Sequence, residues 1–310
     1  MSIVVLEPGI ESRIVDFGRP RTRSLGVPVG GAADRRSLTL GNALVGNASD
    51  APALEIAMKG PRLRAESDIG AVLYGAPFDA HLDGYPIETD RTFMWRAGVE
   101  LHVGGTRQGA RAYLCVRGGF NLSAILASRS ALAPIRKADV LSCESSVVGA
   151  HYCPDLLREF PDTSTVSILP GPQASWFREA ELLSQTFVVT PASNRMGMRL
   201  SGAALTMPQQ EMVSEPVCPG SIQVTRDGQC IILGVDGQTI GGYPKIAQVI
   251  QADLDTLGQM RPGHRLKFAA VSMDAATQRA RQKQSELRAS VMRLQVSLDA
   301  FSAERRFAAS

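Results

Sequence analysis

The segment with the most chemistry in this sequence runs from Asp236 to Lys245 and reads Asp-Gly-Gln-Thr-Ile-Gly-Gly-Tyr-Pro-Lys. Its diglycine, Gly241-Gly242, lets another group approach the backbone closely and leaves amide N–H groups open to an anion or a carbonyl oxygen. Pro244 restricts the turn before Lys245 and so helps to aim the ammonium group. The segment is typical of a binding loop, with an ordinary tight turn as the alternative. Its candidate substrate-binding residues are Gln238, Thr239, Gly241, Gly242 and Tyr243.

Three polar side chains outside this segment have the chemistry to complete a site. Arg195 is able to hold a carboxylate through two parallel hydrogen bonds. Glu215 is a candidate general base, and Gln223 offers an amide to a carbonyl or ureido group. Each of these residue types is more often a surface or structural group, so they indicate a site only together.

A second glycine-rich segment, from Arg23 to Asp34, leads into an expected helix. Backbone amides ahead of a helix N-terminus suit a carboxylate or a phosphate, which makes Gly31 and Asp34 candidate binding residues. The segment is not a P-loop, because the sequence contains no GxxxxGK[ST] pattern. A loop that only caps the helix is the alternative.

Composition excludes several classes of protein. The net charge is +3 with no long run of Lys or Arg, so we expect no nucleic-acid partner. No stretch of about eighteen apolar residues is present, and no secretory signal is recognisable, so we expect no membrane span. With 44% hydrophobic and 20% charged residues the chain has the make-up of a globular protein.

The cysteines and histidines favour neither a disulfide framework nor a metal site. The five cysteines are scattered without a CxxC pair, which favours a reducing, cytoplasmic setting. The four histidines are equally dispersed, so we expect no metal. Ala57-Met58-Lys59-Gly60 resembles the Ala-Met-Lys-Met of biotin carriers, but Gly60-Pro61 breaks the pattern and argues against covalent biotin here.

Short alternating strands punctuated by glycine and proline turns predict a mainly β protein. Two Asp-Gly hairpins are expected, one around Asp83-Gly84 and one around Asp227-Gly228, both with type I′ turns. Further strands are expected at Ser2–Leu6, Ala71–Leu73, Leu101–Val103, Ala112–Val116, Ser167–Leu169, Phe187–Thr190 and Arg265–Phe268.

Helices are few. Asp34 is expected to cap a helix that ends near Gly46-Asn47, and another helix should run from Asp253 to about Met260. Pro172 is expected to open a helix with Trp176, Phe177, Ala180 and Leu183 on one side. The C-terminal stretch has no Gly or Pro, and its narrow apolar seam suits either the chain's own barrel or another protein chain. The seam consists of Leu287, Val291, Leu294, Leu298 and Phe301.

A weak internal repeat suggests two similar lobes. Leu25–Ala33 aligns with Met196–Ala204, and each half of the sequence holds one Asp-Gly hairpin. Pro154 and Pro161 bracket a linker-like stretch between Val147 and Thr165. We therefore expect domains at residues 1–150 and 165–270, followed by a helix at residues 272–310.

Six blocks in a fixed order carry a resemblance to a known family. They are Gly26–Asp34, Asn42–Asn47, Leu54-Glu55 with Gly60-Pro61, Leu169–Gln173 with Trp176-Phe177, Arg195–Leu200, and Gln238–Lys245. Together the blocks resemble the biotin-dependent carboxyltransferase family, which includes allophanate hydrolase subunit 2 and the C subunit of 5-oxoprolinase. The resemblance covers the chain from about Ile3 to Phe268.

The resemblance implies an architecture and partners. The first two domains would be carboxyltransferase subdomains A and B, each a cyclophilin-like β-barrel, and the third would be a C-terminal helix. A smaller cyclophilin-like subunit, and also a third subunit, would join the chain in a cytoplasmic hetero-oligomer.

It also implies an activity. The main hypothesis is a subunit of an ATP-dependent, 5-oxoprolinase-like amidohydrolase that converts 5-oxoproline to glutamate, with ATP bound together with a partner subunit. One alternative is the carboxyltransferase component of a urea-type carboxylase that uses biotin carried on another protein. A further alternative is a non-catalytic regulator that binds a kinase inhibitor. On the main hypothesis Lys245 polarises the substrate carbonyl or holds a carboxyphosphate-like group, Glu215 is the base, and Arg195 holds a carboxylate.

Overall fold

Strands dominate the structure, which confirms the mainly β class predicted from the alternating sequence pattern. The computed structural model describes residues 1–153, 160–161, 163–210 and 212–308, so Pro154 of the expected linker lies outside the described residues. The chain divides into two units. Unit 1 comprises Met1–Gly18, Asp34–Glu159 and Ser285–Ser310, and unit 2 comprises Arg19–Ala33 and Phe160–Gln284. The glycine-rich segment before Asp34 therefore belongs to unit 2, although the residues on either side of it belong to unit 1.

Unit 1 is built from two antiparallel sheets. The six-stranded sheet has the order β11-β1-β4-β9-β6-β7. Its strands are β1 (Ser2–Glu7), β4 (Arg62–Ala65), β6 (Phe78–Leu82), β7 (Tyr85–Pro86), β9 (Glu100–Thr106) and β11 (Val140–Ser142). The five-stranded sheet has the order β2-β3-β10-β5-β8. Its strands are β2 (Glu11–Val15), β3 (Ala53–Ala57), β5 (Ile69–Gly75), β8 (Thr92–Trp95) and β10 (Arg111–Val116).

Helix α1 (Arg35–Leu44) packs on strands β5 and β10 of the five-stranded sheet. Its start is as predicted, because the Asp34 carboxylate accepts a 3.0 Å hydrogen bond from the backbone N–H of Ser37. Gly41 allows the close approach, since a Cβ there would lie 2.8 Å from Sγ of Cys115 and 3.0 Å from Cβ of Tyr74. The helix thus covers β5, which is buried along its whole length, and β10, which is buried at every position after its first.

Seven strands of unit 2 form a closed barrel in the order β12-β19-β16-β17-β14-β13-β20. They are β12 (Thr163–Pro170), β13 (Phe187–Val189), β14 (Gly197–Ser201), β16 (Ser221–Val224), β17 (Cys230–Leu233), β19 (Lys245–Val249) and β20 (Arg265–Ala270). Strands β12 and β20 pair in parallel and the other pairs are antiparallel. The barrel interior is apolar, with the rings of Phe187 and Phe268 at a centroid distance of 5.3 Å. A separate two-stranded ribbon joins β15 (Glu215–Pro216) to β18 (Ile240–Gly241).

The two Asp-Gly hairpins differ in their turns. Between β6 and β7, Asp83 and Gly84 both have positive φ, at 51° and 80°, so the predicted type I′ turn is confirmed. Between β16 and β17 the predicted strand pairing is confirmed, but only Gly228 has positive φ, at 76°. Its N–H donates to the carbonyl of Thr225 at 2.9 Å, so the type I′ prediction is wrong here. A longer connection lets a type I-like turn followed by a left-handed glycine reverse the chain instead.

The helix expected after Pro172 is interrupted. The structure has a 3-10 turn, η2 (Ala174–Trp176), and a short helix, α2 (Glu179–Leu183), separated by Phe177, whose backbone is extended. Leu182 is buried in the barrel core, and Phe177 and Leu183 from the predicted side are partly buried against it. The later helix is split into η3 (Gln251–Asp253) and α3 (Leu254–Gly258).

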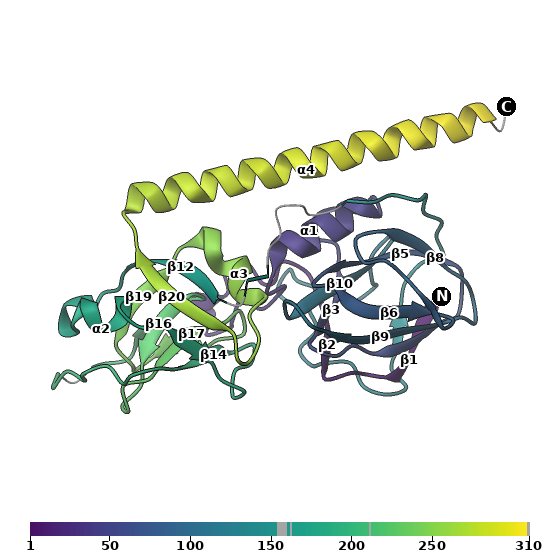
Figure 1. Ribbon diagram of the computed structural model, residues 1–310. Helices are drawn as coiled ribbons and strands as arrows, with labels where there is room; N and C mark the ends of the chain where they lie inside the picture. Colours follow the sequence, from purple (N-terminus) through teal and green to yellow (C-terminus); the bar gives the residue numbers. More distant parts are fainter. Residues whose placement is uncertain (154–159, 162, 211, 309–310) are drawn as a thin grey trace. The chain divides into compact units, whose positions relative to one another are not determined.

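A single long helix, α4 (Met273–Ala308), forms the C-terminal part of the chain, as predicted (Figure 1). Its first turns dock on unit 2. Arg279 donates to Oγ of Ser167 at 2.6 Å, and Lys283 donates to the carbonyl of Ala252 at 2.6 Å. The side chains of Leu298 and Phe301 in the predicted seam lie outside the described part of the chain. Among the helices of the described residues, none is long and apolar enough to cross a membrane.

Candidate functional site: a Lys–Glu pair at the end of a barrel strand

Lys245 is the first residue of β19, and 9% of its side chain is exposed. Its ammonium group donates to Oε2 of Glu215 at 2.6 Å and to the carbonyl of Pro216 at 3.1 Å. A lysine ammonium carries three protons, so these two bonds leave one proton for a further acceptor. Both residues are predicted catalytic groups, and the fold brings them into direct contact across thirty positions of the chain.

The ribbon of β15 and β18 holds Glu215 in place. Glu215 is the register partner of Gly241, and the N–H of Val217 donates to the carbonyl of Thr239 at 3.0 Å. Within the segment Asp236–Lys245, called the diglycine segment below, Ile240–Gly241 therefore forms one strand of this ribbon. Gly241 is confined, because a Cβ there would lie 2.5 Å from Nε2 of Gln223 and 2.9 Å from Nε2 of Gln238.

Gln173 belongs to the same cluster, although its residue type alone did not mark it as a site residue. Its Oε1 accepts from the backbone N–H of Lys245 at 3.0 Å, and its Nε2 donates to Oε2 of Glu215 at 3.2 Å. The residue follows a turn that lies against β19, since a Cβ on Gly171 would come within 2.2 Å of the carbonyl oxygen of Lys245. The available sequence signal was the Pro170-Gly171-Pro172 turn, which places a polar residue directly after a strand.

The charges in this cluster favour the ionised carboxylate. Hydrogen bonds from Lys245, and then from Gln173, lower the pKa of Glu215 from its ordinary value. The side chain of Glu215 remains 42% exposed, so water or a small substrate has access to it. The site therefore combines a largely buried ammonium donor with an accessible carboxylate acceptor.

The other residues predicted on the binding segment surround the pair in different ways. Gln223 is buried, and its Nε2 donates to the carbonyl of Tyr243 at 3.4 Å. Thr239 is buried as well, whereas Gln238, Gly242 and Tyr243 are exposed. The exposed members are therefore the ones that a substrate can reach directly. Gln223 is buried and holds the segment through its hydrogen bond to the carbonyl of Tyr243.

Arg195 has a partner within the protein. Its guanidinium donates to Asp236 through Nε at 2.8 Å and Nη2 at 3.0 Å, and Nη2 also donates to the carbonyl of Gly31 at 2.7 Å. The carboxylate held in two-point fashion is thus that of Asp236, and binding a substrate carboxylate would require its displacement. Gly31, also predicted for binding, supplies a carbonyl to this arrangement. The guanidinium of Arg195 therefore links Gly31 of the glycine-rich segment to Asp236 at the start of the diglycine segment.

Asp34, the remaining predicted binding residue, lies in unit 1. Its two carboxylate oxygens accept from the backbone N–H and the hydroxyl of Ser37, and the residue is buried. The backbone N–H of Asp34 donates to the Tyr113 hydroxyl, which in turn donates to Glu55, both at 2.8 Å. This carboxylate would have to leave its helix-capping position to bind a substrate.

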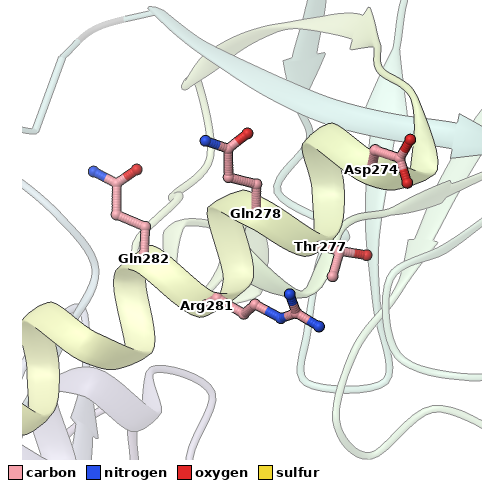
Figure 2. Close-up of a pocket in the computed structure, with 5 residues that line it drawn as sticks. All are labelled: Asp274, Thr277, Gln278, Arg281 and Gln282. Atoms are coloured by element: carbon pink, nitrogen blue, oxygen red, sulfur yellow. The ribbon is translucent and has the colours of Figure 1, made fainter.

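A hollow on the surface of unit 2 lies along the first turns of α4. It is lined by Asp274, Thr277, Gln278, Arg281 and Gln282 (Figure 2). Figure 2 shows Gln278 and Gln282 extending to one side of the helix and Arg281 to the other. Because these side chains diverge, the hollow lacks the convergent polar groups of the Lys245 cluster.

The described residues form a mainly β protein that contains a closed barrel. The family model described as carboxyltransferase domain, subdomain A and B, matches residues 25–270. The chain belongs to this family, which confirms the resemblance inferred from the six sequence blocks.

Two curated relatives match almost end to end. The C subunit of 5-oxoprolinase from Haemophilus influenzae is 35% identical over 300 residues, covering 91% of this chain and 95% of the relative. The protein of the same name from Escherichia coli is 32% identical over 302 residues, covering 90% and 94%. The prediction of an enzyme subunit is consistent with these names and with the carboxyltransferase domain.

A solved structure of a longer enzyme contains the same fold. The urea amidolyase of Kluyveromyces lactis matches with a TM-score of 0.86 and 26% identity over 94% of this chain. This chain spans 20% of that protein. The fold therefore occurs both as a chain of this length and as one part of a much longer protein.

Proposed function

We propose that this chain is the subunit of an ATP-dependent amidohydrolase that opens 5-oxoproline to glutamate, with its reaction centre at Lys245 and Glu215. The observation that carries the proposal is the 2.6 Å Lys–Glu pair at the end of a barrel strand. The end-to-end similarity to two proteins named as the C subunit of 5-oxoprolinase supplies the substrate.

Lys245 would act on the lactam carbonyl. Its remaining proton is available to the carbonyl oxygen, where negative charge develops as a nucleophile adds to the carbon. Glu215, whose ionised form is favoured in this cluster, would take a proton from the attacking water and return it to the ring nitrogen as the amide C–N bond breaks. The pair thus supplies a hydrogen-bond donor and a base about one hydrogen bond apart.

The exposed part of the diglycine segment would hold the ring. Gln238 offers an amide to the lactam N–H or carbonyl, and the Tyr243 hydroxyl offers a donor to the substrate carboxylate. Gly242 leaves room for the ring against the backbone, because the nearest atom to a Cβ there would be Oγ of Ser214 at 3.3 Å. These residues bind and orient the substrate, while Lys245 and Glu215 act on its carbonyl.

ATP would be bound mainly by a partner subunit. The sequence has no GxxxxGK[ST] loop, whereas the Lys245 ammonium fits a single carboxyl or phosphoryl group by charge. ATP, when bound, supplies an activated phosphoryl group to the carbonyl or carboxyl oxygen. In this chain Lys245 would hold the resulting anionic group. The proposed assembly is completed by the smaller cyclophilin-like subunit and a third subunit.

The test is reconstitution. This chain is coexpressed with the smaller subunit and the third subunit, and ATP-dependent release of glutamate from 5-oxoproline is measured. We expect release that stops when this chain is omitted or carries Lys245→Met. A stable complex that contains the wild-type chain and releases no glutamate would contradict the proposal.

A second candidate is carboxyl transfer from biotin carried on another protein to a urea-type substrate. The observation that favours it is the TM-score of 0.86 to a urea amidolyase over 94% of the chain. Lys245 and the amide of Gln238 would then bind the transferred carboxyl and the ureido group. The test adds a biotin carboxylase, a biotinylated carrier, bicarbonate and ATP, and measures urea-dependent ATP turnover. Dependence of that turnover on this chain would favour carboxyl transfer over lactam hydrolysis.

A further inference from the structure

The side chain of Gln173 links the backbone of Lys245 to the carboxylate of Glu215. The residue is 6% exposed and lies in unit 2, in the connection that leads from β12 to η2. Its backbone N–H also donates to the carbonyl of Lys245 at 3.2 Å, so backbone and side chain both attach it to the start of β19. The side chain is therefore fixed with respect to Lys245.

The orientation of the Gln173 amide follows from its partners. A backbone N–H is only a donor, so the Gln173 atom 3.0 Å from the N–H of Lys245 must be the oxygen. The NH₂ group then faces Glu215 and is always a donor. Glu215 must present an acceptor to it, which an ionised carboxylate does with either oxygen.

The two oxygens of Glu215 differ as a result. Oε2 accepts from Nζ of Lys245 at 2.6 Å and from Nε2 of Gln173 at 3.2 Å. Oε1 has one contact among the described residues, with Nε2 of Gln173 at 3.5 Å, which is too long to be a strong hydrogen bond. Oε2 is thus held by two donors, and Oε1 is the oxygen with free acceptor capacity.

We infer that Gln173 is a positioning residue that fixes Oε2 of Glu215 beside Lys245 and so directs Oε1 to take the substrate proton. The inference rests on the proposed role of Glu215 as a base and deepens it by naming the atom and the group that aims it. Gln173 itself does not touch the substrate.

Two substitutions separate this role from general damage. Gln173→Glu keeps the oxygen that accepts from Lys245 but replaces the NH₂ donor with a second carboxylate oxygen facing Glu215. Two facing carboxylates disfavour ionisation, so the pKa of Glu215 should rise. Gln173→Leu removes both bonds without adding charge and should raise it less. Gln210→Glu, at an exposed position, adds the same charge as a matched control.

The direct measurement is an NMR titration with glutamate labelled at the side-chain carboxyl carbon, in which Glu215→Gln identifies the Glu215 signal. We expect the titration midpoint of Glu215 to lie at the highest pH in Gln173→Glu, at a lower pH in Gln173→Leu and at the lowest pH in wild type. The control Gln210→Glu should have the wild-type midpoint. In the reconstituted enzyme the acid limb of kcat/KM should shift in the same order. Turnover at neutral pH should also fall, roughly tenfold in Gln173→Glu, because Oε1 of Glu215 is no longer held in position to take the substrate proton.

The outcomes distinguish the inference from the proposed function. An unmoved Glu215 midpoint in folded Gln173→Glu would overturn the role of Gln173, whether or not the enzyme hydrolyses 5-oxoproline. If Gln173→Glu does not fold, the same titration of Gln173→Leu decides, and an unmoved midpoint there overturns the inference equally. Midpoints that move as expected in an assembly without lactam hydrolysis would contradict the proposed substrate and leave the positioning role standing.

Discussion

The Nζ atom of Lys245 lies 2.6 Å from Oε2 of Glu215, yet the two side chains differ sharply in exposure, 9% for Lys245 and 42% for Glu215. The carboxylate can be hydrated by water, whereas the ammonium depends on protein acceptors. The two ends of one ion pair should therefore respond differently to substitution.

Removing the ammonium should affect catalysis more than stability. Lys245→Met keeps an unbranched side chain of similar length and leaves Glu215 in contact with water. We expect turnover in the reconstituted enzyme to fall by roughly 100- to 1000-fold, as for other preorganised donors, with little change in Tm. Lys267→Met, at an exposed position on β20, is the control. Equal activity of the two variants would remove Lys245 from the reaction centre.

Removing the carboxylate should affect stability as well. In Glu215→Ala the buried ammonium keeps only the carbonyl of Pro216 as an acceptor, so part of its desolvation is no longer offset. We expect a lower Tm for Glu215→Ala than for Lys245→Met, measured by differential scanning fluorimetry at neutral pH. The double variant should recover part of the loss, because no unpaired buried charge remains. The opposite order of Tm values would contradict this account.

Unit 1 should show an acid-sensitive carboxylate at Asp16. Burial acts to raise the pKa of Asp16, but hydrogen bonds from Ser128, Ser130, Arg129 and Gly18 together hold it below its ordinary value of 3.8. A pKa lowered by folding gives stability that is present above the ordinary pKa and is lost as the pH falls through the folded-state value. The free energy of unfolding of wild type should therefore exceed that of Asp16→Asn most at neutral pH.

This difference should shrink as the pH falls below the ordinary pKa of an aspartate, measured by urea denaturation at a series of pH values. Asp50→Asn, at an exposed position, is the control and should differ little from wild type across the range. A difference between wild type and Asp16→Asn that stays constant with pH would show that Asp16 is not stabilising as an anion.

The two glycines of the diglycine segment should tolerate substitution unequally. A Cβ on Gly241 would meet Nε2 of Gln223 at 2.5 Å, and the buried Gln223 has little freedom to move. A Cβ on Gly242 would meet only Oγ of Ser214, at 3.3 Å. We expect Gly241→Ala to disturb the β15–β18 ribbon and lower the Tm, and Gly242→Ala to keep the Tm of wild type, both measured by differential scanning fluorimetry. Similar Tm values of the two variants would contradict this account of the ribbon.

The Arg195–Asp236 pair should hold the glycine-rich segment in place. In Asp236→Asn the buried guanidinium loses its carboxylate, which we expect to lower the free energy of unfolding by about 3 kcal/mol. Arg195→Ala should in addition speed amide hydrogen exchange around Gly31, whose carbonyl it releases. Arg199→Ala, at an exposed position four residues on, is the control. Unchanged exchange near Gly31 in Arg195→Ala would show that the segment is held by other contacts.

Local sequence determined most of the elements and the membership of the family. The Asp83-Gly84 turn, the Asp34 cap and the long C-terminal helix follow from residues that are neighbours in the chain, so their physical causes are readable there. Errors occurred where local signals were ambiguous. Asp227-Gly228 formed a longer turn than its dipeptide indicated. The stretch after Pro172 broke at Phe177, whose backbone is extended and whose side chain packs against the barrel core.

The tertiary structure decided which polar groups meet. Closure of the barrel and the register of β15 with β18 bring Glu215 to Lys245 over thirty positions and Gln173 to Lys245 over seventy-two. Closure of the barrel also pairs the guanidinium of Arg195 with the carboxylate of Asp236 instead of with a ligand. Residue types in a sequence show which charges and amides are present. Strand register and barrel closure depend on contacts between distant segments, so only the folded chain decides how those groups are paired.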